Sequence, residues 1–466
     1  MRTAGGVVPE VQLDEVPRAR KGLVLTEQVR TAITSGALPA GTPLAASRVV
    51  AAELAVSRGV VVRAFEQLSA EGFLESRPGS GTRVAATSAG TERPASALDV
   101  ARVAGDNPGL PDPELFPRHD WSAAHQRVVA RLGNSDLLYG DPRGLDALRT
   151  SLADYLRRTR GISADPECIV VVNGVAQALA MISLLLSRTG RHPTIAVEDP
   201  GSAGTCAQLR WWGARLAPVP VDDAGLDVDA LRRAHARRAV DAVAVTPAHQ
   251  YPTGVVLAAD RRSELAAFAA HHDALVIEDD YDADYRYDRR PISSIRDLAP
   301  DHVIAVGSVS KSMGPGVRLG WMVAPRRLVA DFADIRSNID LCAPVITQAV
   351  LSELIDAGAL DRHIRRTRAE YRRRSSTLLG ELARTFPDAH VPGVPAGLHV
   401  AVDLPPRLTE RPTVEAARTA GFVAQPMSRY RHRPGAPGIV LGFAHLPPPA
   451  IERAGRVMSQ VLVSER

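Results

Sequence analysis

The chain has 466 residues, 45% of them hydrophobic, which is enough for large buried cores and more than one domain. No stretch reaches the ~20 consecutive apolar residues of a membrane helix, and the N-terminus carries acidic residues in place of a signal-peptide core. The three cysteines stand far apart and form no CxxC pair. The sequence therefore predicts a protein of a reducing compartment, the cytoplasm, with no metal site and no membrane partner.

The net charge of +4 is concentrated near the N-terminus. Residues 18–84 contain nine Arg and Lys against five Glu, a surplus of four, so the remainder of the chain is neutral. A basic module on a neutral protein indicates a polyanionic partner. A chance fluctuation of four charges explains the same count, so charge alone leaves both interpretations open.

Residues 18–85 predict a compact helical domain that ends in a hairpin. One helix is expected around residues 25–33, a second at about 47–54, and a third after the capping residue Ser57. The first and third helices repeat apolar residues at helical spacing, and these are Leu25, Val29 and Ile33 in the first and Val61, Phe65 and Leu68 in the third. Residues 72–84 then predict two short strands with a glycine-rich tip. This order of elements is typical of a winged helix-turn-helix.

A winged helix-turn-helix inserts its third helix into the major groove of double-stranded DNA. We expect early residues of that helix to reach phosphates or base edges, the N-terminus of the second helix to bind a phosphate, and the hairpin tip to approach the backbone or the minor groove. The predicted DNA-binding residues are Ser47, Arg48, Ser57, Arg58, Arg63, Gly79, Ser80 and Gly81. A winged helix used for protein contacts alone is the alternative.

Residues 86–112 are rich in Ala, Ser, Thr, Gly and Pro and predict an interdomain linker. From residue 113 to 466, apolar runs alternate with helical stretches. The expected strands are 168–172, 194–198, 242–246, 274–278, 303–307, 320–324, 398–402 and 439–443. This alternation predicts an α/β domain with a mostly parallel sheet covered on both faces. In such domains ligands bind beyond the carboxyl ends of the strands.

Lysine is rare in this chain, and its two positions are informative. Of the 56 basic residues, Lys21 and Lys311 are the lysines. Lys311 lies in the large domain, in the loop GSVSKSMGPGVRLG that follows a predicted strand. Arginine cannot replace lysine in an imine, because only a deprotonated amine attacks a carbonyl group. A solitary lysine in a large domain therefore indicates covalent chemistry.

The residues near that loop favour an aldehyde cofactor that carries a phosphate. Ser308 and Arg318 can hydrogen-bond a phosphate, and so can the backbone amides of Val175 and Ala176 at the start of a predicted helix.

A second post-strand segment, EDDY, fits the ring of the same cofactor. A carboxylate beside a pyridine nitrogen keeps that nitrogen protonated, and Asp279 is the residue that we assign to this contact. Tyr281 can hydrogen-bond the phenolic oxygen. Two carboxylates that merely cap a strand end are the structural alternative for this segment.

Two resemblances to known families follow from these motifs. The stretches SGALPAGTPL and VSRGVVVRAFEQLSAEGFLESRPGSGTRV resemble the GntR family of bacterial regulators, with departures at Ala45 and Val60. The serine-lysine loop with Arg318, together with EDDY, NGVAQ, YGDPRG and HQYPTG, resembles the fold-type I aminotransferases over most of residues 113–466. The combination resembles the MocR subfamily of GntR-type transcription regulators.

The resemblance implies a fold-type I, pyridoxal 5'-phosphate (PLP)-dependent aminotransferase-like domain, with a large mostly parallel sheet and a small C-terminal α/β subdomain. It assigns Lys311 to the Schiff base with PLP, Asp279 to the pyridine nitrogen, and Ser308 and Arg318 to the phosphate. It also implies a homodimer, in which Tyr139 reaches the phosphate of the neighbouring subunit. Such a domain senses PLP, or PLP with a small amino compound, and controls binding to a DNA operator.

Three departures from the aminotransferase pattern favour a sensor over a catalyst. Tyr251 stands where the enzymes have Asn before Pro-x-Gly, Ser202 stands where an aromatic residue is common, and residues 438–443 hold no arginine. Arg429 and Arg431 are the candidate substitutes for a carboxylate clamp, with Arg433 nearby, although surface charge explains each equally well. An aminotransferase with an autoregulatory DNA-binding arm and a scaffold that has lost PLP are the alternative functions.

Overall fold

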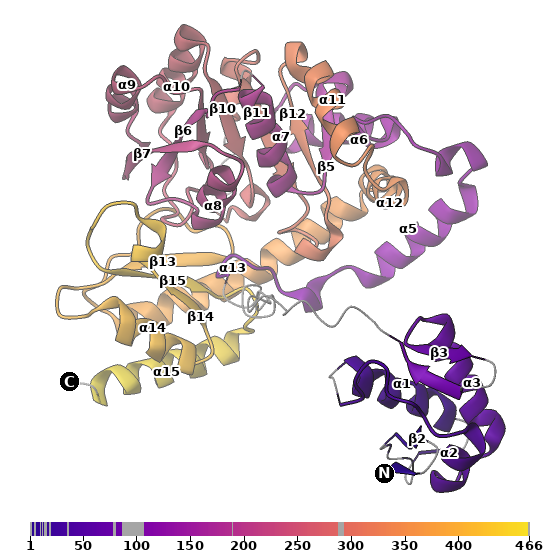
Figure 1. Cartoon of the computed structure of the whole chain (residues 1–466). Coiled ribbons are helices and arrows are strands. Elements are labelled where there is room, and N and C mark those ends of the chain that lie inside the picture. The colour runs from indigo at the N-terminus through magenta and orange to yellow at the C-terminus, as the bar shows by residue number, and fades with distance from the viewer. Residues whose placement is uncertain are drawn as a thin grey trace. The chain divides into compact units, whose positions relative to one another are not determined.

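The computed structural model describes residues 2–3, 6–9, 11, 13, 16–17, 20–34, 37–77, 81–85, 107–188, 190–287 and 293–464. The chain divides into two compact units, Met1–Val100 and Ala101–Arg466 (Figure 1). Within the described ranges no helix is long and apolar enough to cross a bilayer. The same ranges hold no group of three or more His, Cys, Asp or Glu side chains that could bind a metal ion.

The first unit is a winged helix-turn-helix, as predicted. Its elements are β1 (Arg2–Thr3), β2 (Gly6–Val7), α1 (Lys21–Thr34), α2 (Ser47–Glu53), α3 (Arg58–Ala70), β3 (Leu74–Arg77) and β4 (Gly81–Val84). The apolar faces predicted for the first and third helices form its core, since Leu25, Val29, Val61 and Leu68 are fully buried. Strands β3 and β4 pair antiparallel and form the wing, whose tip at residues 78–80 lies outside the described residues.

The second unit contains an eight-stranded sheet in the order β5-β12-β11-β10-β9-β6-β7-β8. The strands are β5 (Ile169–Val172), β6 (Thr194–Asp199), β7 (Arg215–Asp222), β8 (Gly225–Leu226), β9 (Ala242–Val245), β10 (Leu275–Asp279), β11 (Val303–Ser308) and β12 (Gly320–Val323). The five strands from β11 to β7 run parallel, while β12 is antiparallel to both of its neighbours. The predicted, mostly parallel sheet is therefore confirmed.

Helices cover both faces of this sheet (Figure 1). Alternate residues of the strands pack against α7 (Val175–Ser187), α8 (Ala203–Trp211) and α11 (Val329–Ile339) on one face. The opposite face packs against α9 (Val228–Arg237) and α10 (Ala259–His272) at one end and α5 (Arg118–Arg131), α6 (Asp146–Arg160) and α12 (Val345–Asp356) at the other. Burial on both faces explains why the strands read as continuous apolar runs.

A smaller C-terminal α/β layer completes the second unit. Its sheet has the order β13-β15-β14, with β13 (His399–Asp403), β14 (Val423–Pro426) and β15 (Gly438–Gly442) all antiparallel. It packs with α13 (Ala359–Thr385), α14 (Glu410–Thr419) and α15 (Pro448–Ser464) around one apolar core. This layer is the small subdomain that the family resemblance implied.

The predicted linker, residues 86–112, is described from Asn107 onward, and there it packs onto the second unit. Asp112 is buried and pairs with Arg374 of α13 at 2.8 Å. Pro108 lies so close to Gly442 of β15 that a Cβ atom on the glycine would stand 2.5 Å from the Pro108 carbonyl oxygen. The contact therefore requires glycine at position 442.

Candidate functional site

A solvent-open cleft of about 1300 Å³ lies beyond the carboxyl ends of β10 and β11. The folded chain brings together there seven of the residues predicted to bind the cofactor. These are Val175, Ala176, Asp279, Tyr281, Ser308, Lys311 and Arg318. The convergence follows from topology, because neighbouring parallel strands deliver the residues that follow them to one edge of the sheet.

Lys311 points into the cleft and makes one hydrogen bond there. Its Nζ atom donates to the carbonyl oxygen of Gly109 at 2.7 Å. Burial lowers the pKa of the amine, and the charges of Asp282 and Asp279 oppose that shift. A lowered pKa increases the fraction of neutral amine, which is the form that attacks a carbonyl group.

Asp279, the last residue of β10, carries a carboxyl oxygen that lacks a partner. Its Oδ1 atom is buried and makes no hydrogen bond within the described part of the chain. Burial, assisted by the charge of Asp280, raises the pKa of this carboxyl group to about 7, while Lys311 acts in the opposite direction. Buried polar atoms in folded proteins almost always have partners. An N–H donor from a ligand ring, such as a protonated pyridine nitrogen, fits this position.

The opposite end of the cleft can accept a phosphate. Gly174, with φ +89°, precedes α7, and no acceptor within the described ranges takes the N–H groups of Val175 and Ala176. The Arg318 guanidinium lies over this turn, 3.3 Å from the position of a Cβ atom on Gly174, and donates to the backbone carbonyl of Asn173. Free amides at a helix N-terminus beside a guanidinium group form an anion site.

Aromatic rings line another part of the cleft. The Tyr251 hydroxyl donates to the Tyr430 hydroxyl at 3.2 Å, and the Tyr251 ring meets Tyr281 edge-on, with ring centroids 5.8 Å apart. Tyr251, a residue that departs from the aminotransferase pattern, thus packs against Tyr281 and Tyr430 in the cleft. Ser202 also lines the cleft, where it caps α8 by accepting from Thr205 N.

The structure separates the candidate carboxylate ligands. Arg429 lines the cleft and donates to Gln425 Oε1 at 3.2 Å. Arg431 and Arg433 line a different, shallow surface depression, and Arg431 donates to the carbonyl oxygen of Ala436. Within the described lining of the cleft, Arg318 and Arg429 are thus the arginines available to an anionic ligand.

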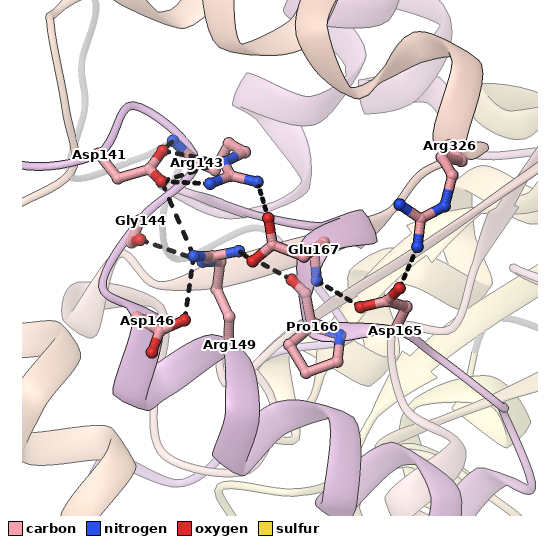
Figure 2. Close-up of polar contacts among 9 residues, drawn as sticks. All are labelled: Asp141, Arg143, Gly144, Asp146, Arg149, Asp165, Pro166, Glu167 and Arg326. Atoms are coloured by element: carbon pink, nitrogen blue, oxygen red, sulfur yellow. Dashed lines mark hydrogen bonds and ion pairs between the residues drawn. The ribbon is translucent and has the colours of Figure 1, made fainter.

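Tyr139 does not line this cleft, and 82% of its surface is exposed. The chain that follows it is held by an ion-pair network (Figure 2). Asp141 pairs with Arg143 at 2.6 Å, and the buried Arg149 donates to Gly144 O and, at 3.0 Å, to Glu167. The network fixes the start of α6, from which the Tyr139 segment extends.

The predicted DNA-binding residues of the first unit lie at the starts of α2 and α3. Arg48, Ser57, Arg58 and Arg63 are exposed, and Ser47 is half-buried as the first residue of α2. No acidic partner within the described ranges pairs with the three arginines. Ser57 is the N-cap of α3 but makes no side-chain cap bond. Gly81 opens β4 with φ +81°, whereas Gly79 and Ser80 lie outside the described residues.

Sequence reasoning did not assign a role to several residues around the cleft. Asn107 and Pro108 line the cleft, and the Gly109 carbonyl oxygen accepts a hydrogen bond from Lys311. These three residues belong to the segment that the sequence predicted to be a linker. His249 contacts the Tyr281 hydroxyl from behind, at 3.1 Å. The motif HQYPTG, which contains His249, follows a predicted strand, but nothing in the sequence indicates that His249 contacts Tyr281.

Two family models match the chain. The model of aminotransferase class I and II matches residues 104–449, and that of the bacterial regulatory proteins of the gntR family matches residues 23–84. The chain also resembles the crystal structure of a kynurenine aminotransferase from Pyrococcus horikoshii, with a TM-score of 0.71 and 26% identity, over 80% of this chain and 96% of that one. Fold and site thus define an aminotransferase-like domain joined to a DNA-binding module.

Curated relatives have the same two-part organisation. The chain is 35% identical to the pyridoxine biosynthesis transcriptional regulator PdxR of Corynebacterium glutamicum, over 90% of this chain and 91% of the relative. It is 32% identical to the probable rhizopine catabolism regulatory protein MocR of Rhizobium meliloti, over 93% and 91%. The chain belongs to the MocR subfamily of GntR-type transcription regulators.

Proposed function

We propose that this regulator binds PLP covalently at Lys311 and that the bound ligand controls binding of the winged helix-turn-helix to a DNA operator. The observation that carries the proposal is the pairing, in one cleft, of a half-buried lysine with a buried carboxyl oxygen that has no partner. The anion site at the start of α7 supports it. These three features match an aldehyde, a ring nitrogen and a phosphate.

Each chemical group of PLP would have a partner in this cleft. Lys311 would bond to the aldehyde carbon, Asp279 would accept from the ring nitrogen, and Tyr281 would donate to the phenolic oxygen. The phosphate would lie between the guanidinium of Arg318, the hydroxyl of Ser308, and the amides of Val175 and Ala176. Bound PLP supplies an aldehyde and an electron-withdrawing ring for reaction with amines.

The effector that we propose is PLP itself or an adduct of PLP with a small amino compound. Ser202 and Tyr251 replace residues typical of the enzymes, which favours ligand sensing over turnover. Arg429 could still bind a carboxylate on an amino compound, because it lines the same cleft. The likeness to a relative named for pyridoxine biosynthesis supports a role in vitamin B6 metabolism, and the relative named for rhizopine catabolism supports an amino compound.

We also propose that the working form is a homodimer. Tyr139 is exposed on the surface of its own subunit, beside Leu137 and Leu138, which are 64% and 70% exposed. Large apolar side chains in such a row are typical of an interface. In a dimer, Tyr139 would reach the phosphate in the partner's cleft.

The first test is a visible absorption spectrum of the purified protein with PLP, compared with Lys311→Ala. A visible band from the lysine-bound cofactor is expected in the wild type and not in the variant. An operator is then selected from a random duplex pool, and its affinity is measured with and without PLP. Equal affinity in both conditions would refute control by PLP, and absence of the band would refute cofactor binding.

The second candidate is an aminotransferase with a DNA-binding arm, which the presence of Lys311, Asp279 and Arg318 in one cleft favours. This function predicts sustained conversion of an amino donor and a keto acid by the purified protein. A single conversion that stops when the bound cofactor has been consumed would favour the regulator.

A further inference from the structure

A buried histidine–aspartate couple lies directly behind the Tyr281 side chain. His249 Nδ1 is 2.8 Å from Asp282 Oδ2 and 3.1 Å from the Tyr281 hydroxyl oxygen. Both members of the couple are 3% exposed, whereas Tyr281 lines the cleft. The contact forms because β9 and β10 are adjacent and parallel, so that the loops after them meet. The roles assigned above use neither His249 nor Asp282.

The couple determines which way the Tyr281 proton points. A carboxylate only accepts hydrogen bonds, so the Nδ1 proton lies on His249 and is directed to Asp282. Because Nδ1 carries this proton, it cannot accept a hydrogen bond from the Tyr281 hydroxyl. In its contact with His249, the Tyr281 oxygen can therefore only accept, and it shares the Nδ1 proton with Asp282. The Tyr281 O–H therefore points away from Nδ1, toward one of two acceptors: Asp282, which also lies within hydrogen-bond reach, or a ligand in the cleft. Because His249 already donates to Asp282 Oδ2, the ligand is the acceptor that no other group occupies.

The backbone of Gly397 closes the couple off from behind. Gly397 has φ +66°, and a Cβ atom on it would stand 2.6 Å from His249 Cε1. Its carbonyl oxygen accepts from the Tyr287 hydroxyl at 2.5 Å, which holds this backbone in place. The Gly397 backbone therefore packs against the couple so closely that any side chain at this position would collide with it.

The other ionisable groups around His249 leave this arrangement intact. His399 of β13 has its ring centroid 5.3 Å from that of His249, and its Nε2 atom donates to Pro252 O. Burial lowers the pKa of His399 to about 3, so the ring stays neutral. Burial and the charge of Asp282 raise the pKa of Tyr281, so the phenol keeps its proton. The remaining groups are Tyr251 on the same loop, Arg286, which donates to Ala248 O, and Lys311 and Asp279 in the cleft.

We propose that His249 and Asp282 are positioning residues that hold the Tyr281 hydroxyl as a hydrogen-bond donor to the phenolic oxygen of the cofactor bound at Lys311. The inference rests on the proposed PLP binding. A donor at that oxygen stabilises its negative charge, most strongly when the nitrogen of Lys311 beside it has lost its proton. The donor therefore lowers the pH at which the Lys311-bound cofactor loses that proton.

The test is a pH titration of the visible absorption of the PLP-loaded full-length protein. Tyr281→Phe is expected to raise the pH at the midpoint of this titration. His249→Leu is expected to raise the midpoint as well, because Tyr281 then turns to donate to Asp282. The expected rise is about one pH unit, which is the scale of one net hydrogen bond. His249→Asn is expected to restore the wild-type midpoint, since its amide N–H replaces the Nδ1 donor.

His399→Gln is the matched control, because it alters a neighbouring buried imidazole that makes no hydrogen bond to Tyr281. Its midpoint should equal that of the wild type, and a shift as large as that of His249→Leu would overturn the inference. The inference would also be overturned if His249→Leu or Tyr281→Phe titrated with the wild-type midpoint. The Tyr281→Phe measurement remains a test even if the His249→Leu variant does not fold. Absence of the visible band from the wild type would instead refute PLP binding itself.

Discussion

Asp279→Asn should make the cofactor-free protein more stable while it weakens PLP binding. The native carboxyl group has a pKa of about 7, against an ordinary value of 3.8. Between these values the native state holds a proton that the unfolded state has released. Stability is therefore lost as pH rises from 4 to 7, by ~4 kcal/mol at most, because one pKa unit corresponds to about 1.4 kcal/mol.

Asparagine cannot ionise, so the variant avoids this loss. Its buried amide still lacks a partner, which costs ~1–3 kcal/mol, so we expect a net gain of ~1–3 kcal/mol at pH 8. The sharper expectation is the trend, in which the advantage of the variant grows by ~1.4 kcal/mol per pH unit from pH 5 to 7. Excess PLP should reverse the order, since ligand at 1,000 times its Kd stabilises the wild type by ~4.1 kcal/mol.

Urea denaturation followed by tryptophan fluorescence measures this difference. All four tryptophans, Trp121, Trp211, Trp212 and Trp321, lie in the second unit, so the signal reports on that unit alone. Asp141→Asn is the control. Although burial opposes the shift, hydrogen bonding by Arg143, 2.6 Å away, lowers the pKa of the Asp141 carboxyl group, so its removal should destabilise the protein at neutral pH. A pH-independent difference, or an Asp279→Asn variant less stable than the wild type at pH 8, would refute the reasoning.

Three further predictions concern the packing around the cleft and the DNA-binding unit. Arg374→Met should cost ~3–5 kcal/mol in urea denaturation, because it leaves the buried Asp112 carboxylate without its partner, and Asp112→Leu in the same chain should recover part of the loss. Gly442→Ala should cost ~1–3 kcal/mol in the same assay, because the added methyl group meets Pro108. Arg63→Ala should weaken operator binding and, if its contact is to phosphate, reduce the slope of log affinity against log salt by about 1.

Strands could be predicted from the sequence where both faces are buried. β9 and β10 are short apolar runs flanked by polar residues, and the structure confirms them. β7 and β14 were not predicted. β7 contains Pro218 and Pro220, and its residues are mostly half-buried near the edge of the sheet, so it shows no apolar run.

The cleft could be predicted in part for a similar reason. Lys311, Asp279 and Arg318 each follow or precede a recognisable strand, and parallel topology brings such positions together. The couple of His249 and Asp282 could not be predicted, because the two residues meet only through the relative positions of two loops. Its proposed role also depends on which atom carries one hydrogen, and a sequence does not show this. The same holds for the difference between Arg429 and Arg431, two residues apart in the chain but on different surfaces.

One hydrogen bond links the predicted sensing residue to the segment that follows the DNA-binding unit in the sequence. Lys311 donates to Gly109 O, and the segment from Asn107 to Gly109 is held by Pro108 against Gly442. A lysine nitrogen that bonds to an aldehyde carbon keeps at most one hydrogen, so its contact with Gly109 must change when the ligand binds. Regulation requires a ligand that stabilises two states of the protein unequally. If PLP binds at Lys311 as proposed, the contact between Lys311 and Gly109 is a site where PLP itself, without a second effector, would create such a difference.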